Sequence, residues 1–350
     1  VFMLLGVIAT ALLFFPNQPG SWLIAAILFI FANIGFAGSL VYYDALLPHV
    51  ARADEIDQVS SRGYMMGYFG GGILLAVNQV MIMVLPEVFP QLGKGLMTRL
   101  SFVTVALWWF GFTLPLLFKV KEPLRRIEEG EEDLHPIRAS LIRLKKTFLD
   151  LKKYRDLSLG LLAFWIYANG IGTIITMATI YGKELNFSDT TLIGTLLMVQ
   201  ILAAPFAMLF GWLAKKIGTK KAIYLSLVIY SLIAVAGYFL YHEWQFWVLG
   251  AAVATVQGGS QALSRSMIGK MMPKSKSAEF YGFFSVFEKF ASILGPFIFG
   301  VVSHLMNESR LSIASLILFF GLGLFVLTKV NLERGVKVAS DEEAKLITVE

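Results

Sequence analysis

The sequence of 350 residues contains no cysteine and only four histidines. The lack of cysteine excludes disulfide bonds and thiolate metal sites and leaves the redox compartment undetermined. The histidines, His49, His135, His242 and His304, lie too far apart for a metal-binding spacing, so we predict no metal and no other cofactor. A glycine-rich loop ending in Gly-Lys-Ser or Gly-Lys-Thr is also absent, which argues against an ATP-driven pump.

Charged residues are scarce as well. They make up 15% of the chain and hydrophobic residues 57%, against about 25% and about 45–50% in soluble domains. Runs of the length that crosses a bilayer, about 20 apolar residues, recur along the sequence. They cover residues 1–15, 22–47, 64–85, 97–119, 157–181, 189–214, 222–241, 244–264, 279–304 and 310–330. Strand-like alternation is absent, so we predict an all-α membrane protein with about ten transmembrane helices.

The basic residues are distributed unevenly over the predicted loops. If the first span runs outward, 25 lysines and arginines fall on one side of the membrane and four on the other. The positive-inside rule makes the richer side cytoplasmic, so the central linker and the C-terminus are predicted to be cytoplasmic. The net charge of +6 is therefore a topology signal, and we predict no nucleic-acid partner. The loops on the opposite side are mostly too short for an active site, so no enzyme is predicted.

The predicted domains are set by one polar segment. Residues 1–119 form an N-terminal bundle, 157–332 a six-helix C-terminal bundle and 333–350 a cytoplasmic tail. Between the bundles, the linker 120–156 carries apolar residues at helical spacing from Ile137 to Leu151, with basic residues between them. This pattern predicts an amphipathic helix on the anionic cytoplasmic leaflet, although a specific partner site is the alternative.

The two halves also resemble each other. GFAGSLVYYD at 35–44 resembles VQGGSQALSR at 256–265, and the alignment of the two stretches places Asp44 at the position of Arg265. The next helices open with the similar sequences Arg-Gly-Tyr and Tyr-Gly-Phe. In this alignment the spans 157–181 and 189–214 have no counterpart in the first half. The repeat predicts two further helices upstream of Val1. The full-length protein would then have two halves of six helices each, and the present sequence would contain four helices of the first half and six of the second.

Parallel six-helix repeats joined by a basic linker are the architecture of major facilitator transporters. GWLAKKIGTKKAI at 211–223 resembles the signature of that superfamily between the second and third helices of each half. The match includes Gly211, Lys216, Gly218 and Lys220, whereas Lys215 replaces the acid and Thr219 replaces the first base. The acid normally helps to latch the cytoplasmic side, and its replacement puts that latch in question.

A narrower resemblance follows from YYDALLP at 42–48, SSRGYMMGYFGGG at 60–72 and the segment 261–300. These stretches resemble the branch containing the fungal autophagy-related vacuolar effluxers of amino acids and their bacterial relatives. The resemblance implies a multi-pass transporter that moves a small polar solute by alternating access. We also predict a monomer, with protons as candidate coupling ions and with the plasma membrane as its location if the source is prokaryotic. A transport-inactive receptor, an assembly factor and a lipid or solute channel are the alternatives.

Polar residues within apolar spans are the candidate functional residues, because burial of polar groups in a membrane is costly. The predicted substrate or coupling residues are Glu288, Lys289, Asn169, Gln200, Gln257 and Gln261. Interhelical hydrogen bonding is the alternative role for the uncharged ones. The predicted cytoplasmic gate consists of Asp44, Arg265, Lys216 and Lys220.

Glycine is concentrated at 61–72, where SRGYMMGYFGGG runs into an apolar span. A phosphate-binding loop would instead lie between a strand and a helix. Residues spaced four apart share a helix face, so we predict close helix packing rather than a ligand loop. The predicted packing and bending residues are Gly63, Gly67, Gly71, Gly295, Pro296 and Gly300.

Overall fold

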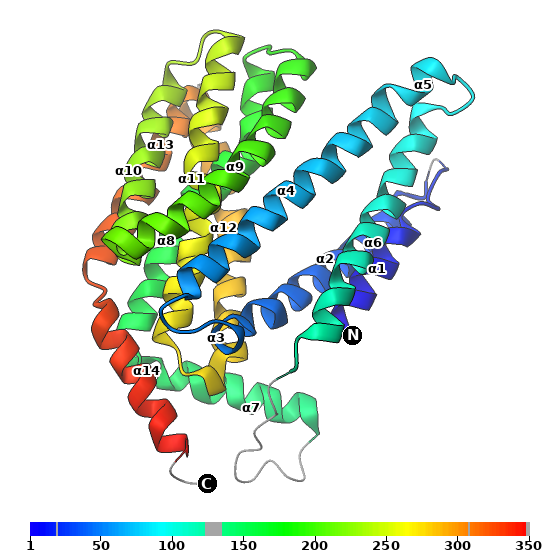
Figure 1. Cartoon of the computed structure of the whole chain (residues 1–350). Coiled ribbons are helices and arrows are strands. Elements are labelled where there is room, and N and C mark those ends of the chain that lie inside the picture. The colour runs from blue at the N-terminus through cyan, green and yellow to red at the C-terminus, as the bar shows by residue number, and fades with distance from the viewer. Residues whose placement is uncertain (19, 123–134, 307–308, 348–350) are drawn as a thin grey trace. The chain divides into compact units, whose positions relative to one another are not determined.

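The computed structural model describes the whole chain except residues 19, 123–134, 307–308 and 348–350 (Figure 1). None of the described residues forms a β-strand. The helices are α1 (Phe2–Leu12), α2 (Trp22–Ala45), α3 (Leu47–Val50), α4 (Ile56–Met83), α5 (Leu85–Val88), α6 (Lys94–Lys119), α7 (Pro136–Leu149), α8 (Arg155–Glu184), α9 (Asp189–Ile217), α10 (Thr219–Tyr238), α11 (Glu243–Met271), α12 (Ser277–Met306), α13 (Ser309–Thr328) and α14 (Leu332–Ile347). Two short 3-10 turns, η1 (Asp150–Lys152) and η2 (Lys274–Lys276), precede α8 and α12.

Each of the ten predicted spans falls on a helix, which confirms the all-α membrane class. Within the described chain, eight helical segments are long and apolar enough to cross a bilayer. The other two predicted spans need correction. Helix α1 has only 11 residues, and α11 has 29 residues but carries too many polar side chains to be among the eight. Most of the second half of α11 is buried inside the protein, so its polar residues contact protein rather than lipid.

The chain divides into two compact units. Unit 1 comprises residues 1–46 and 70–124, and unit 2 comprises residues 47–69 and 125–350. Helix α4 is shared, because its first half belongs to unit 2 and its second half to unit 1. The predicted division at 119, 156 and 332 stays a prediction.

In unit 1, α1 packs against α2 and α6. The helices α1 and α2 approach at two glycines: a Cβ atom on Gly35 would lie 2.3 Å from the backbone nitrogen of Gly6. Asn78 of α4 accepts a hydrogen bond of 2.7 Å from Thr104 of α6. Close backbone approach and interhelical hydrogen bonds stabilise helix pairs where lipid provides no hydrophobic driving force.

In unit 2, the long helices α8 to α13 run side by side, and α9 with α11, α8 with α12 and α8 with α13 are the largest pairings (Figure 1). Helices α7 and α14 lie at one end of this bundle (Figure 1). The predicted amphipathic linker helix is thus present as α7. Thr147 hydrogen-bonds to Glu279 and the Phe148 ring contacts Phe283, while Leu141 remains 62% exposed.

The predicted packing glycines have different surroundings. A Cβ atom on Gly295 of α12 would lie 2.2 Å from Thr173 Oγ1 and 2.5 Å from the Asn169 carbonyl oxygen of α8, so this helix contact requires glycine. At Gly67 and Gly300 the structure provides no support for the predicted close packing, which stays a prediction. Both lie on exposed helix faces, and a Cβ atom there would meet no atom of the described chain within 4 Å. For Gly63 and Gly71 packing stays a prediction.

This difference provides a test on one helix. Gly295→Ala is expected to lower the free energy of unfolding by about 1–3 kcal/mol, since the obstructing Asn169 carbonyl is backbone and cannot rotate away. Gly300→Ala is the matched control and should leave stability unchanged or slightly raised, because its Cβ enters open space. Thermal unfolding in detergent measures both variants. Equal melting temperatures would refute the assigned helix contact.

Candidate functional site

A row of polar side chains lies on the first half of α4, within unit 2. Asp57, Ser60, Tyr64 and Tyr68 follow one another at steps of three, four and four residues, which places them on one face of the helix. Their partners lie on α10 and α11. We call this row and its partners the polar seam.

At the start of the seam, the Asp57 carboxylate is 7% exposed and accepts three hydrogen bonds. Thr219 Oγ1 donates to Oδ2 at 2.7 Å, Ser266 Oγ donates to Oδ1 at 2.6 Å, and Lys270 Nζ donates to Oδ2 at 2.5 Å. Lys270 also donates to Thr219 Oγ1 at 2.8 Å. The buried charge is therefore both paired and hydrogen-bonded, which is the condition for tolerating it away from water.

One turn further along, Arg265 of α11 binds Ser60 twice. Its Nε donates to Ser60 Oγ and its Nη2 to the Ser60 carbonyl oxygen, each at 3.0 Å. Ser60 Oγ in turn donates to the Ala262 carbonyl oxygen at 2.7 Å. The Arg265 guanidinium lies 4.8 Å from the centre of the Tyr64 ring, within the range of a cation–π contact.

At the far end of the seam, the Tyr68 hydroxyl links two predicted substrate residues. It donates to Gln261 Oε1 at 2.5 Å and accepts from Gln257 Nε2 at 3.1 Å. The Tyr68 ring lies against Gly258, where a Cβ atom would come within 3.0 Å of it. Two of the predicted residues thus bond to a tyrosine that sequence reasoning missed.

Small residues bring α9 against the same part of α4. A Cβ atom on Gly211 would lie 2.7 Å from the Ser61 side chain, so the first glycine of the sequence motif serves as a helix-crossing point. The motif residue Thr219 begins α10 and donates to Asp57. An acid from α4 thus binds the first residue of α10, while position 215 of the motif is a lysine.

The other basic residues of the motif bind elsewhere. Lys220 Nζ donates to the carbonyl oxygens of Thr328 and Val330 at 3.1 and 2.6 Å, so it caps the C-terminal end of α13. The Lys216 ammonium lies 3.9 Å from the centre of the Trp212 ring, one turn away on α9. Their predicted gate roles stay predictions, and these contacts provide no support for them.

The remaining predicted residues are separated. Asn169 is buried and donates to the Trp165 carbonyl oxygen of its own helix at 2.6 Å, so its predicted role stays a prediction. Gln200 is half-buried, and Lys289 is exposed on α12. Asp44 belongs to unit 1 and Arg265 to unit 2, so a pairing of these two residues stays a prediction.

Helix α14 is attached to the start of α8 by ion pairs. Arg334 donates to both oxygens of Asp156 at 2.5 and 2.8 Å, and Lys153 pairs with Glu342 at 2.5 Å. The hydrogen bond to Asp156 raises the pKa of Arg334 above its ordinary value. Burial raises the pKa of Glu342. The bond to Lys153 and the charges of nearby lysines together lower it by a larger amount, so the pKa of Glu342 lies below its ordinary value.

Within the described part of the chain, no group of three or more histidine, cysteine, aspartate or glutamate residues has the arrangement of a metal site. The polar seam offers instead a carboxylate, two cations, two carboxamides, two phenols and several hydroxyls. Such groups recognise a polar solute or hold two helices together.

Comparison with solved structures defines the class of protein. The Escherichia coli fucose:proton symporter FucP, a major facilitator superfamily transporter, superposes with a TM-score of 0.68 at 13% identity and covers 94% of this chain and 83% of its own. At this identity the likeness concerns the fold alone. The fold is that of the major facilitator superfamily.

The sequence comparisons define the family. The profile of the family described as "Vacuole effluxer Atg22 like" matches residues 1–340. YxiO of Bacillus subtilis, described as an uncharacterized MFS-type transporter, is 36% identical over 342 residues, which are 97% of this chain and 78% of YxiO. Autophagy-related protein 22-1 of Penicillium rubens is 26% identical over 302 residues, 79% of this chain but only 50% of the fungal protein. The chain belongs to the Atg22-like family of major facilitator transporters.

Proposed function

We propose that this protein is a secondary active transporter that moves a small, amino-acid-like solute out of the compartment facing its basic loops. Membership of a family named for effluxers supports efflux, and the resemblance to the fungal amino-acid effluxers supports the solute class. The 25-to-four distribution of basic residues supports a cytoplasmic linker and C-terminus.

The observation that carries the proposal is the convergence of Gln257 and Gln261 on the Tyr68 hydroxyl. We propose that Glu288, a half-buried carboxylate of α12, belongs to the same site. Two carboxamides provide both donors and acceptors, and a carboxylate provides acceptors alone. Together they can bind the ammonium and carboxylate groups of an amino acid. Glu288 is the proposed proton-coupling group, because carboxylates within transmembrane segments serve in proton relays.

The polar seam supports alternating access. It joins α4 to α10 and α11 through side-chain hydrogen bonds and an ion pair, which are contacts that can break and re-form as discrete units. We propose that the seam forms in the state closed to the cytoplasm and opens when solute is exchanged on that side.

The test is counterflow in proteoliposomes. Vesicles preloaded with a mixture of unlabelled protein amino acids are diluted into a trace of the labelled mixture, and a carrier should transiently accumulate label above equilibrium. With an imposed pH gradient, the wild type should show gradient-driven flux, whereas Glu288→Gln should retain counterflow and lose that flux. An exposed carboxylate at the end of α8 provides the control Glu184→Gln, which should behave as wild type.

Other outcomes distinguish the alternatives. Label that equilibrates without overshoot indicates a channel. Saturable binding without flux indicates a receptor. Unchanged proton coupling in Glu288→Gln would exclude Glu288 as the coupling group while leaving the carrier function intact.

A further inference from the structure

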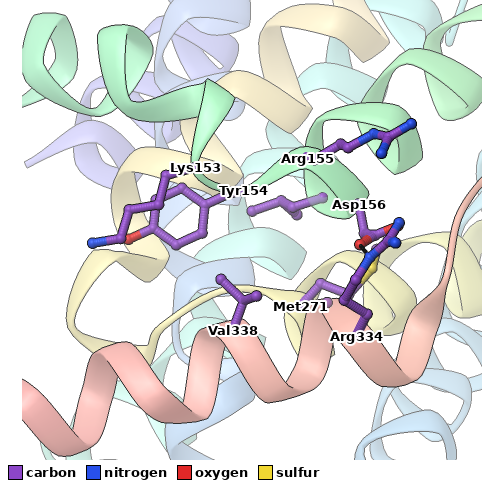
Figure 2. A pocket seen from close by; sticks show the side chains of 9 residues that line it. Lys153, Tyr154, Arg155, Asp156, Met271, Arg334 and Val338 are labelled. Carbon is purple, nitrogen blue, oxygen red and sulfur yellow. Dashed lines mark hydrogen bonds and ion pairs between the residues drawn. The ribbon is translucent and has the colours of Figure 1, made fainter.

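A pocket lies in unit 2, and none of the residues of the polar seam lines it. It has a volume of about 230 Å³ and is enclosed by the start of α8, the end of α11 and one face of α14 (Figure 2). Helix α14 comes close at Gly335, where a Cβ atom would lie 2.8 Å from Met271 Sδ and 3.3 Å from Asp156 Cβ. The pocket is thus built by tertiary contacts between three helices.

The lining combines apolar and basic side chains. Leu157, Met271 and Val338 contribute apolar surface, and Lys153, Arg155 and Arg334 contribute positive charge. Tyr154 lies between Lys153 and the Asp156–Arg334 pair (Figure 2). A ligand that satisfies both kinds of surface must be amphiphilic and anionic.

The three cations differ in how they are paired. Arg334 binds Asp156 and Lys153 binds Glu342, so most of their charge is compensated. Arg155 is exposed and has no hydrogen-bond or ion-pair partner among the residues that the structure describes. It extends away from the Asp156–Arg334 pair (Figure 2). This guanidinium group is available to an anion.

The position of the pocket indicates the source of that anion. The apolar segment of α8 begins at Arg155, and α13 ends at Thr328, shortly before α14. Ends of membrane-spanning helices lie at the level of the lipid head groups, where basic pockets between helices bind anionic lipids. A free inorganic anion has no apolar group that could pack against the apolar part of the lining.

We propose that this pocket binds an anionic phospholipid, with its phosphate at Arg155 and its glycerol and upper acyl carbons against Leu157, Met271 and Val338. The bound lipid bridges α8 and α14 and thereby stabilises the attachment of the C-terminal helix. The site does not depend on the transported solute.

The test uses the full chain in dodecyl maltoside, with the melting temperature measured against added dioctanoyl phosphatidylglycerol. A saturable rise is expected with this lipid, and none with dioctanoyl phosphatidylcholine or with inorganic phosphate. Arg155→Gln should raise the apparent Kd about fivefold, the factor that corresponds to one basic residue near an anionic lipid surface. Lys337→Gln, an exposed charge on α14 that does not line the pocket, should leave the Kd unchanged.

A steric pair tests the location. Val338→Phe fills the pocket and should abolish the saturable rise, whereas Val336→Phe, two residues away and 38% exposed, should not. Equal effects of the two dioctanoyl lipids, an equal effect of phosphate alone, or retained binding in Val338→Phe would each overturn the proposal. If Val338→Phe fails to fold, the exposed Arg155→Gln variant decides, and an unchanged Kd there overturns it.

Discussion

Asp57→Ala is expected to lower the free energy of unfolding by about 3 kcal/mol, the low end of the range for removing one partner of a buried ion pair. The substitution leaves the Lys270 ammonium, whose side chain is 19% exposed, without its carboxylate. It also removes the acceptor of the Thr219 and Ser266 hydroxyls. Thermal or denaturant unfolding in detergent measures the loss. The same variant should reduce counterflow, because the polar seam loses its first contact.

Two further variants identify the cause. Asp54→Ala removes an acid three residues earlier whose pair with Arg52 is 3.4 Å long and largely exposed, so its cost should stay below about 1 kcal/mol. Lys270→Met in the Asp57→Ala background removes the uncompensated cation and should recover part of the lost stability. If Asp57→Ala and Asp54→Ala unfold at the same temperature, the seam does not stabilise the protein.

Tyr68→Phe is expected to reduce the initial rate of counterflow on the order of tenfold. Loss of the hydroxyl leaves Gln257 without its acceptor and Gln261 without its donor, and an unsatisfied buried polar group costs about 1–3 kcal/mol. A cost of about 1.4 kcal/mol corresponds to a factor of ten in rate if it falls on the transport step. Counterflow over a range of solute concentrations separates a change in apparent KM from a change in maximal rate.

The control is Tyr241→Phe, a tyrosine in unit 2 that is 57% exposed and lies outside the seam. It should transport as wild type. A purely structural role for Tyr68 predicts a lower melting temperature with unchanged KM, whereas a role in holding the glutamines toward solute predicts a raised KM. Wild-type rate and KM in Tyr68→Phe would exclude Tyr68 from the solute site.

Much of the fold could be predicted from the sequence because the bilayer restricts the options. A span must satisfy its own backbone hydrogen bonds, so apolar runs of sufficient length become helices. This holds even for α11, whose polar residues were expected within a span and are covered by protein. The amphipathic pattern of the linker likewise identified α7, since local periodicity alone determines it.

The site was only partly predictable. Gln257, Gln261 and Glu288 stand out because they are polar residues within apolar spans. Asp57 and Tyr68 do not. The predicted span begins at residue 64, whereas helix α4 begins at Ile56. Asp57 therefore lies outside the predicted span. The sequence signal for these residues was the spacing of Asp57, Ser60, Tyr64 and Tyr68, which places them on one face of a helix.

By itself the sequence determined that this is a helical membrane protein of the major facilitator type and indicated its family. These properties depend on composition, periodicity and local motifs. Only the tertiary structure decided which polar groups meet. The acid that binds Thr219 lies 162 positions away in the chain, and Gln261 bonds to a tyrosine 193 positions away. Contacts at such separation depend on how helices pack, and residue spacing along the chain does not encode that packing.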